Sequence, residues 1–354
     1  MRILAIASHL SATLSIHLLR PLQGLGGFEA PLLTQDAIAK LVASAPGANA
    51  SQVAAFLLDK VKPDLVFSSR YNDILAEELV LACRQRNLPF IFHMDDNLME
   101  VSPDQGADKV AFYQHPARLR ALRVQMEQAS LAYFSTEALR DRMVELGITM
   151  NSYVGPICAA VDLLPDLAPA AAQAPLVFGY AASAGHGEDL KLALPGIRAA
   201  LERFPTARFE LIGSVAPVAE LAAFGDRARY EQRFMPYDDY VVDLRRRGWS
   251  LGLSPLCNNP FTRMKTYTKW VEYTAAGIPT IASDHPVYRE CCAGGAARLV
   301  GDGDWHDALP ALLDDAAARQ TMLATARARV GRDYTVARLR EQLLEAFRRA
   351  GASP

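Results

Sequence analysis

The sequence predicts an α/β protein with two Rossmann-like, doubly wound domains that face each other across a cleft. The chain has 354 residues, 51% of them hydrophobic, which is enough for two full cores. Short apolar segments alternate with amphipathic helical segments throughout, the pattern of parallel sheets covered on both faces. An Ala- and Pro-rich stretch at Asp162–Pro175 interrupts this alternation and is the candidate interdomain linker.

The first half is expected to form strands and helices in alternation. Expected strands are Arg2–Ser8, Phe28–Leu32, Asp64–Ser68, Pro89–Met94, Leu131–Ser135 and Asn151–Val154, and expected helices are Ser11–Gln23, Ala50–Val61, Asn72–Arg86, Pro116–Gln128 and Glu137–Leu146. The glycines at 24–27 follow a helix and lack the G-x-G-x-x-G spacing, so they indicate a helix cap in preference to a nucleotide loop. Leu98–Val110, with Pro103 and Gly106, is expected to be a mobile loop.

The second half repeats the pattern. Expected strands are Leu176–Ala181, Arg208–Ile212, Arg229–Phe234, Leu251–Leu256, Thr280–Ser283 and Ala297–Val300, and expected helices are Leu190–Arg203, Val218–Ala223, Asp238–Arg247 and several from Trp305 onward. The predicted division is an N-terminal domain at 1–165, a C-terminal domain at 175–334 and a final helical segment at 335–354, with its helix at Thr335–Ala350.

The composition excludes several classes of protein. A net charge of -2 gives no support to nucleic-acid binding, which usually needs a basic excess. The five cysteines show no C-x-x-C pair, and the vicinal Cys291-Cys292 is a poor disulfide geometry, so reduced thiols in a cytoplasmic protein are expected. The apolar start is too short for a secretory signal, and the uncharged stretch near 167–187 contains Pro169 and Pro175, which argues against a membrane span.

Asn258–Asp284 is predicted to form a loop, a helix and a buried strand. Asn258 or Asn259 is expected to cap the helix, Pro260 suits its first turn, and Gly277 ends it. Within such a helix, positions 265, 269 and 272 recur at i, i+4 and i+7 and therefore share one face.

That face carries Lys265, Lys269 and Glu272. A helix N-terminus with two lysines attracts a diphosphate, because backbone N–H groups, the helix dipole and ammonium groups all favour an anion. A carboxylate further along accepts hydrogen bonds from sugar hydroxyls. The alternative is a solvated helix face with a Lys269–Glu272 ion pair.

His93, Asp95 and Asp96 stand where the buried strand Pro89–Met94 ends. Functional side chains of parallel α/β sheets collect at the carboxyl ends of the strands, so all three are candidates for chemistry. A metal site is not indicated because no third ligand lies nearby in the sequence. The alternative is that one aspartate caps a turn and the other is solvated.

Arg118, Arg120 and Arg123 give one predicted helix a basic side. Such a side is usually a solvated surface, and contact with an anionic lipid surface is the alternative interpretation.

Three segments resemble the GT-B glycosyltransferases, and among them family 4 of the retaining enzymes. FGYAASAGHGEDLKLALPGIRAALERFPTARFELIG (178–213) is similar to the opening βαβ unit of the family's nucleotide-sugar domain, and NPFTRMKTYTKWVEYTAAGIPTIASD to its E-(A/Y)-A-A-G-x-P-V-V-A-S signature. PFIFHMDDNL is similar to a central strand of the N-terminal domain that ends in paired aspartates. The resemblance spans most of the chain and implies a GT-B fold.

The resemblance also implies roles for single residues. Glu272 matches the family's glutamate that binds the donor's ribose, whereas Met264 stands where the family has another glutamate. Lys265, Thr266 and Lys269 are then candidates for the donor's phosphates. The family's Arg/Lys pair is not obvious here, and Ser183, Gly185 and His186 occupy the edge that faces the phosphates.

The implied activity is transfer of a sugar from a UDP- or GDP-sugar to a glycan, lipid-linked or protein acceptor, with retention and without a metal. Lys265 is the catalytic candidate at the leaving phosphate, and Asp95, Asp96 and His93 orient the sugars. Synthesis of a cell-surface polysaccharide or glycoconjugate is expected, in the cytoplasm or at the inner face of the membrane through peripheral contact of the N-terminal domain. The alternatives are a GT-B relative with another activity, such as an epimerase, and a non-catalytic binding module. A dehydrogenase is disfavoured because neither half has G-x-G-x-x-G after its first strand.

Overall fold

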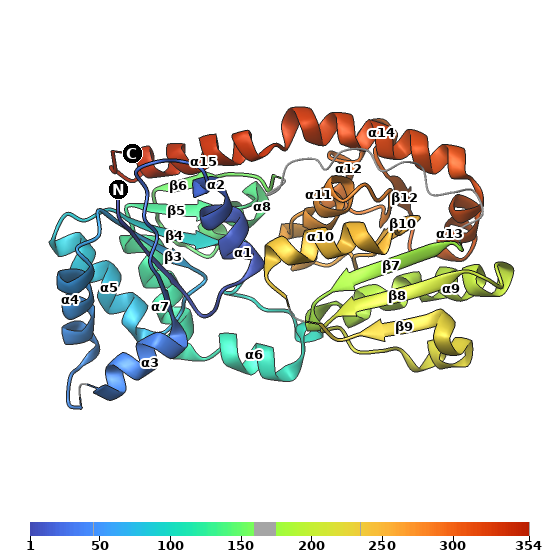
Figure 1. The fold of residues 1–354 in the computed structure, drawn as a ribbon. Coiled ribbons are helices and arrows are strands. Elements are labelled where there is room, and N and C mark those ends of the chain that lie inside the picture. Colours follow the sequence, from blue (N-terminus) through green and yellow to red (C-terminus); the bar gives the residue numbers. More distant parts are fainter. Residues whose placement is uncertain (45, 159–174, 234, 354) are drawn as a thin grey trace.

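A computed structural model describes residues 1–44, 46–158, 175–233 and 235–353. These residues form two six-stranded parallel sheets, one in each half of the chain (Figure 1). The first sheet has the order β2-β1-β3-β4-β5-β6 and the second β12-β11-β10-β7-β8-β9. This arrangement confirms the predicted fold class of two doubly wound α/β units. The candidate linker lies outside the described residues apart from Pro175.

The strands are short and mostly buried, as expected where helices cover both faces of a parallel sheet. The first sheet contains β1 Ile3–Ala7, β2 Leu32–Thr34, β3 Leu65–Ser69, β4 Phe90–Met94, β5 Leu131–Phe134 and β6 Ser152–Val154. The second contains β7 Val177–Ala182, β8 Arg208–Gly213, β9 Ala228–Glu231, β10 Leu251–Ser254, β11 Thr280–Ser283 and β12 Arg298–Val300.

The helices of the first half begin with one continuous helical stretch, in which α1 Ala12–Leu14, a π-helical turn Ser15–Leu19 and α2 Arg20–Leu22 follow each other directly. The others are α3 Gln35–Ser44, α4 Ala50–Val61, α5 Ile74–Gln85, α6 Ala107–Tyr113, α7 Pro116–Gln128 and α8 Glu137–Glu145. The second half contains α9 Gly187–Arg203, α10 Tyr237–Arg247, α11 Thr268–Ala275, α12 Pro286–Arg289, α13 Trp305–Asp314, α14 Ala316–Asp333 and α15 Val336–Arg349. No helix in the described segments is both long and apolar enough to cross a bilayer.

Three elements of the first half differ from the sequence prediction. The predicted strand Phe28–Leu32 is regular only from Leu32, because Pro31 has no N–H to donate to a neighbouring strand. Before Pro31 there is a single bridge, between Glu29 and Arg2. The helix α3 was not predicted, and it buries only Ile38 against the core. The predicted loop Leu98–Val110 contains the start of α6, whose N-cap is Gly106 with φ 97.

The final helix α15 packs against the first sheet, although it follows the second sheet in the chain. Leu343, Ala346 and Phe347 lie in one hydrophobic cluster with residues of β1, β3, β4 and β5. Arg340 fixes the helix further, because its guanidinium donates hydrogen bonds to the carbonyls of Pro21 (3.1 Å) and Gln23 (2.7 Å). Figure 1 shows α14 and α15 in red along one side of both halves, so the chain's end joins them.

Phe347→Ala is therefore expected to lower the free energy of unfolding by about 3–5 kcal/mol, the usual cost of removing a fully buried phenylalanine side chain. Arg348→Ala is the matched control, because the neighbouring Arg348 side chain is 62% exposed and should change stability by less than about 0.5 kcal/mol. Urea denaturation measures both variants. Equal values for the two would contradict this packing of α15.

Candidate functional site

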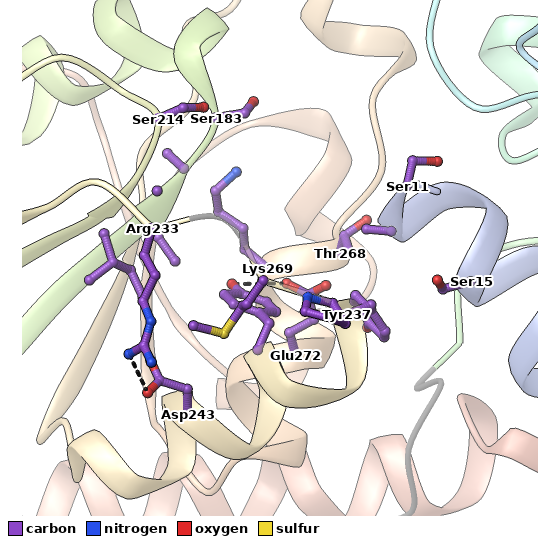
Figure 2. Close-up of a pocket in the computed structure, with 18 of the residues that line it drawn as sticks. Ser11, Ser15, Ser183, Ser214, Arg233, Tyr237, Asp243, Thr268, Lys269 and Glu272 are labelled. Carbon is purple, nitrogen blue, oxygen red and sulfur yellow. Dashed lines mark hydrogen bonds and ion pairs between the residues drawn. The ribbon is translucent and has the colours of Figure 1, made fainter. Parts of the chain in front are cut away.

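A cavity of about 530 Å³ lies between the two halves at the carboxyl edge of the second sheet. Its walls come from the ends of β7 and β8, from α10 and α11, and from the start of the N-terminal helical stretch. Figure 2 shows Ser11 and Ser15 of that stretch on the side opposite Arg233 and Asp243. Ligands of open α/β sheets bind at this edge, so the cavity is the candidate site.

The helix that carries the predicted site residues is shorter than expected. Asn259 and Thr262 cap each other, since each backbone N–H donates to the other's side chain (3.0 and 2.9 Å), and a separate 3₁₀ turn follows at Thr262–Met264. Lys265 is then extended, with φ -71 and ψ 173, and α11 begins only at Thr268. The prediction that Lys265 shares a helix face with Lys269 and Glu272 is therefore wrong.

Glu272 lies in the wall of the cavity and is 7% exposed. The hydroxyl of Tyr240 donates a hydrogen bond to its Oε2 (3.4 Å), and Tyr237 bonds the same carboxyl. Burial raises the pKa of Glu272 to about 7, against the lowering effects of Lys269 and the two tyrosine hydroxyls. When it is ionised, this carboxylate is held by the two tyrosines in the cavity wall, where it can accept hydrogen bonds from a diol.

Lys269 lies in the first turn of α11 and also lines the cavity. Its Nζ is 5.6 Å from the centre of the Tyr180 ring, and in Figure 2 its amino group lies toward Ser183 and Ser214. Burial lowers the pKa of Lys269 to about 8, with Lys265 contributing and the carboxylates of Asp189 and Glu272 opposing. The amine is thus a cation near neutral pH without a direct carboxylate partner among the described residues.

The loop after β7 brings two of its three predicted residues to the cavity. Ser183 and His186 line it, the latter with its Nδ1 2.7 Å from Oδ2 of Asp189. Gly185 instead faces the N-terminal half, where its carbonyl accepts a hydrogen bond from Gln105 Nε2 at 2.8 Å. A Cβ at Gly185 would meet Gln105 Oε1 at 2.3 Å, so a larger residue there would displace the Gln105 side chain.

Asp95 and Asp96 follow β4 and form a separate charged cluster that does not line the cavity. Asp95 accepts a hydrogen bond from Thr13 Oγ1 (2.6 Å) and pairs with Arg70 (3.2 Å), while Asp96 lies 3.6 Å from Lys265 Nζ. Burial alone would raise the pKa of Asp95, but Arg70 and the Thr13 hydroxyl hold it below its usual value. Lys265 therefore joins the two halves of the protein by an ion pair.

His93 is fully buried inside β4, where its ring lies 4.2 Å from His17 and 5.0 Å from Tyr133, measured between ring centres. Burial lowers the pKa of His93 well below its ordinary value, so the ring is neutral. This placement contradicts the predicted contact of His93 with a sugar. Thr266 does not line the cavity either, because its hydroxyl bonds that of Thr268 (2.6 Å), and Thr268 is the lining residue.

The residues of α10 that line the cavity were not predicted from the sequence. Tyr237 and Tyr240 are three residues apart on one helix face, a spacing that was a usable signal. At the far end of the cavity Asp243 pairs with Arg233 (3.3 Å) and Arg247 (2.7 Å). Both arginines also pair with Glu231, and Arg247 pairs with Glu210 as well. Lys269 has no such carboxylate partner among the described residues, so it is the cation placed to meet an anionic ligand.

The titrations of Glu272 and Lys269 predict a pH dependence of ligand binding. A ligand diol that needs ionised Glu272 should bind about tenfold more weakly for each unit below pH 7, since that pKa is about 7. The extra affinity that a phosphate adds should fall above about pH 8, where Lys269 loses its proton. Calorimetric titration with uridine and with UDP across this range separates the two effects. Affinities that do not change with pH would contradict both assignments.

Within the described residues, no group of three His, Cys, Asp or Glu side chains is arranged to hold a metal ion. All five cysteines are free, and the sulfurs of Cys291 and Cys292 lie 3.6 Å apart without a disulfide.

Comparisons with known proteins agree with this architecture. Residues 196–345, less than half of the chain, match a family described as glycosyl transferase-like. HepE of Anabaena in complex with UDP is similar in structure, with a TM-score of 0.69 and 14% identity over 98% of this chain and 100% of that one. No curated protein sequence matches the chain.

Two further solved structures are similar along nearly their whole length. The E. coli trehalose-6-phosphate structure bound with UDP-2-fluoro glucose has a TM-score of 0.61 and 15% identity, over 98% of both chains. A putative UDP-N-acetylglucosamine 2-epimerase of Listeria monocytogenes has a TM-score of 0.58 and 13% identity, over 98% of this chain and 95% of that one.

At these identities the solved structures establish the fold, and the family match covers the half that contains α10 and α11. The chain has the GT-B fold, and its residues 196–345 are similar to a family described as glycosyl transferase-like.

Proposed function

We propose that the chain transfers a sugar from a UDP-sugar to an acceptor hydroxyl, with the donor held in the cavity between the two halves. The observation that carries the proposal is the pairing of a buried carboxylate, Glu272, with a half-buried amine, Lys269, one turn apart at the carboxyl edge of a sheet. UDP is the nucleotide bound in the HepE complexes, which favours it over GDP.

In this proposal Glu272 accepts hydrogen bonds from the two ribose hydroxyls. The diphosphate lies between the first turn of α11 and the loop after β7, near Lys269, Thr268, His186 and Ser183. The free N–H groups at the start of α11 and the ammonium group both favour an anion there. Lys265, held by Asp96, contributes charge from further away.

The chemistry follows from this donor. The bond between C1 of the sugar and the phosphate oxygen breaks, its electron pair stays on the β-phosphate, and C1 passes through an oxocarbenium-like state. Lys269 stabilises the developing negative charge, so we propose that the reaction needs no metal. The acceptor oxygen bonds to C1 on the face that the phosphate leaves, and the phosphate takes the acceptor's proton, which retains the anomeric configuration.

The acceptor is proposed to enter at the end of β4 in the N-terminal half, where Asp95 and Asp96 orient it. If the enzyme inverted instead, one of the two would serve as general base, but the lowered pKa of Asp95 makes that residue a weak base. The acceptor is a glycan, a lipid-linked saccharide or a protein, in synthesis of a cell-surface polysaccharide or glycoconjugate.

We further propose a cytoplasmic location, with peripheral contact of the N-terminal half at the inner face of the membrane. The arginines of α7 have partners within this half of the protein: Arg118 bonds Asn72, Arg120 bonds Glu77, and Arg123 bonds Glu127. Arg120 remains 72% exposed and is the one most open to an anionic lipid surface.

A thermal-shift panel of UDP, GDP, ADP and CMP, each with the corresponding sugar nucleotides, tests the donor. A ligand at 100 times its Kd stabilises the folded state by about 2.7 kcal/mol, so UDP and a UDP-sugar are expected to raise Tm clearly. A rise with GDP alone would contradict the choice of base. No rise with any nucleotide would contradict the proposed activity and favour a binding module.

A second candidate function is epimerisation of a UDP-sugar, favoured by the structural similarity to the Listeria protein. Incubation with a UDP-sugar and no acceptor separates the two. A transferase without acceptor returns the donor unchanged or releases UDP slowly, whereas an epimerase converts it to an isomeric UDP-sugar that chromatography resolves.

A further inference from the structure

The imidazole of His186 is held by a hydrogen-bond chain that begins in the protein interior. The backbone N–H of Cys257 donates to Asp189 Oδ1 at 2.8 Å, and Asp189 Oδ2 bonds His186 Nδ1 at 2.7 Å. Asp189 lies in the first turn of α9 and is only 5% exposed. Both of its oxygens are thus occupied, one by the loop after β10 and the other by the ring that lines the cavity.

This chain fixes the position of the proton on the ring. Burial would raise the pKa of Asp189, but the bond from His186 and the N–H of Cys257 hold it below its usual value, so the group is an ionised acceptor. His186 Nδ1 must then carry a hydrogen. In the neutral ring Nε2 is left as a bare acceptor, and it is the nitrogen free to meet a ligand in the cavity.

Burial, with help from two lysines, keeps His186 neutral in the protein without a ligand. Burial and the cations Lys269 and Lys265 lower its pKa to about 4, while Asp189 raises it. A bare Nε2 facing a phosphate oxygen would place two acceptors against each other. A diphosphate beside the ring raises the pKa of His186, because an adjacent anion favours the imidazolium.

We propose that Asp189 is a positioning residue that holds the ring of His186 in place. When the donor's diphosphate binds, the imidazole of His186 takes up one proton. Its Nε2–H then donates a hydrogen bond to the β-phosphate. The proton comes from solvent on binding and returns to solvent when the nucleoside diphosphate leaves. As the C1–O bond breaks, this hydrogen bond and Lys269 share the charge that develops on the phosphate. The inference rests on the proposed function, since it needs a diphosphate in the cavity.

The test is a pH titration of the protein with ¹⁵N-labelled histidine, free and saturated with UDP or uridine. The chain has seven histidines, and the His186→Gln variant identifies the resonances of this one. With UDP, the pKa of His186 is expected to rise from about 4 to about 7 or above, so that the ring is protonated near neutral pH, whereas uridine should leave the pKa unchanged. UDP binding with an unshifted His186 would overturn this role alone. Absence of UDP binding would overturn the proposed donor and this role together.

Asp189→Asn tests the positioning. The asparagine amide donates to Nδ1 and moves the neutral ring's hydrogen to Nε2. This Nε2–H can donate to a phosphate without protonation of the ring, so UDP should bind with no proton uptake, and uridine equally well. Glu188→Gln is the matched control, because that neighbouring carboxylate is 50% exposed and pairs with Lys191 on the surface. An Asp189→Asn protein that still takes up one proton when UDP binds would overturn the proposal. If that variant fails to fold, the titration of the wild-type protein still decides.

Discussion

Replacing Glu272 by alanine is expected to abolish sugar transfer and to weaken donor binding by at least about 100-fold. Two ribose hydroxyls lose a charged acceptor, and hydrogen bonds to charged groups contribute about 1.5–3 kcal/mol each. Uridine and UDP should lose affinity by the same factor, because both contain the ribose. Calorimetric titration measures binding, and UDP release in the presence of acceptor measures transfer.

The fold of the Glu272→Ala protein should remain intact. Burial raises the pKa of Glu272 above its unfolded value of 4.5, so its stabilising contribution is present below that value and is lost as the pH rises through about 7. At neutral pH the ionised carboxylate contributes little to stability, and its removal is tolerated. Glu272→Gln keeps the shape and one acceptor, and should show an intermediate loss of affinity. Unchanged turnover in the alanine variant would remove Glu272 from the site.

Lys269→Ala is expected to lower kcat by about 10²–10³-fold, which corresponds to about 3–4 kcal/mol of transition-state stabilisation. The amine lines the cavity, and the charge of the leaving diphosphate is greater in the transition state than in the bound donor. Binding of UDP should weaken while binding of uridine stays close to that of the wild-type protein. Equal losses for the two ligands would exclude a phosphate role for Lys269.

Lys265→Ala is the comparison variant. Lys265 pairs with Asp96 at 3.6 Å and does not line the cavity, so its loss should weaken UDP binding less than the loss of Lys269. It should still affect UDP more than uridine, because its charge reaches the phosphates at longer range. If UDP affinity fell more in Lys265→Ala than in Lys269→Ala, Lys265 and not Lys269 would be the lysine that contacts the phosphates.

The strands and the end of α11 were predictable because their signals are local. Runs such as PFIFHM and LAYF are apolar on both faces, as buried parallel strands must be. Gly277 has φ 80 and follows α11, as predicted for a glycine that ends a helix. The late start of β2 at Leu32 has an equally local cause, the missing N–H of Pro31, which could have been recognised in the sequence.

The errors concern side chains whose position depends on distant residues. His93 lies within β4, where helices cover both faces of the sheet and bury it, whereas Asp95 and Asp96 lie beyond the last strand residue. Sequence spacing does not distinguish the last buried position of a strand from the first accessible one. Likewise, the contact of Tyr240 with Glu272 joins two helices that are adjacent only in the folded chain.

The most direct test of a donor site in this cavity is a crystal structure with UDP bound. We expect the ribose hydroxyls to bind Glu272 and the diphosphate to lie beside Lys269 and His186, at the first turn of α11. UDP bound elsewhere, or bound here with its phosphates directed away from Lys269, would contradict it.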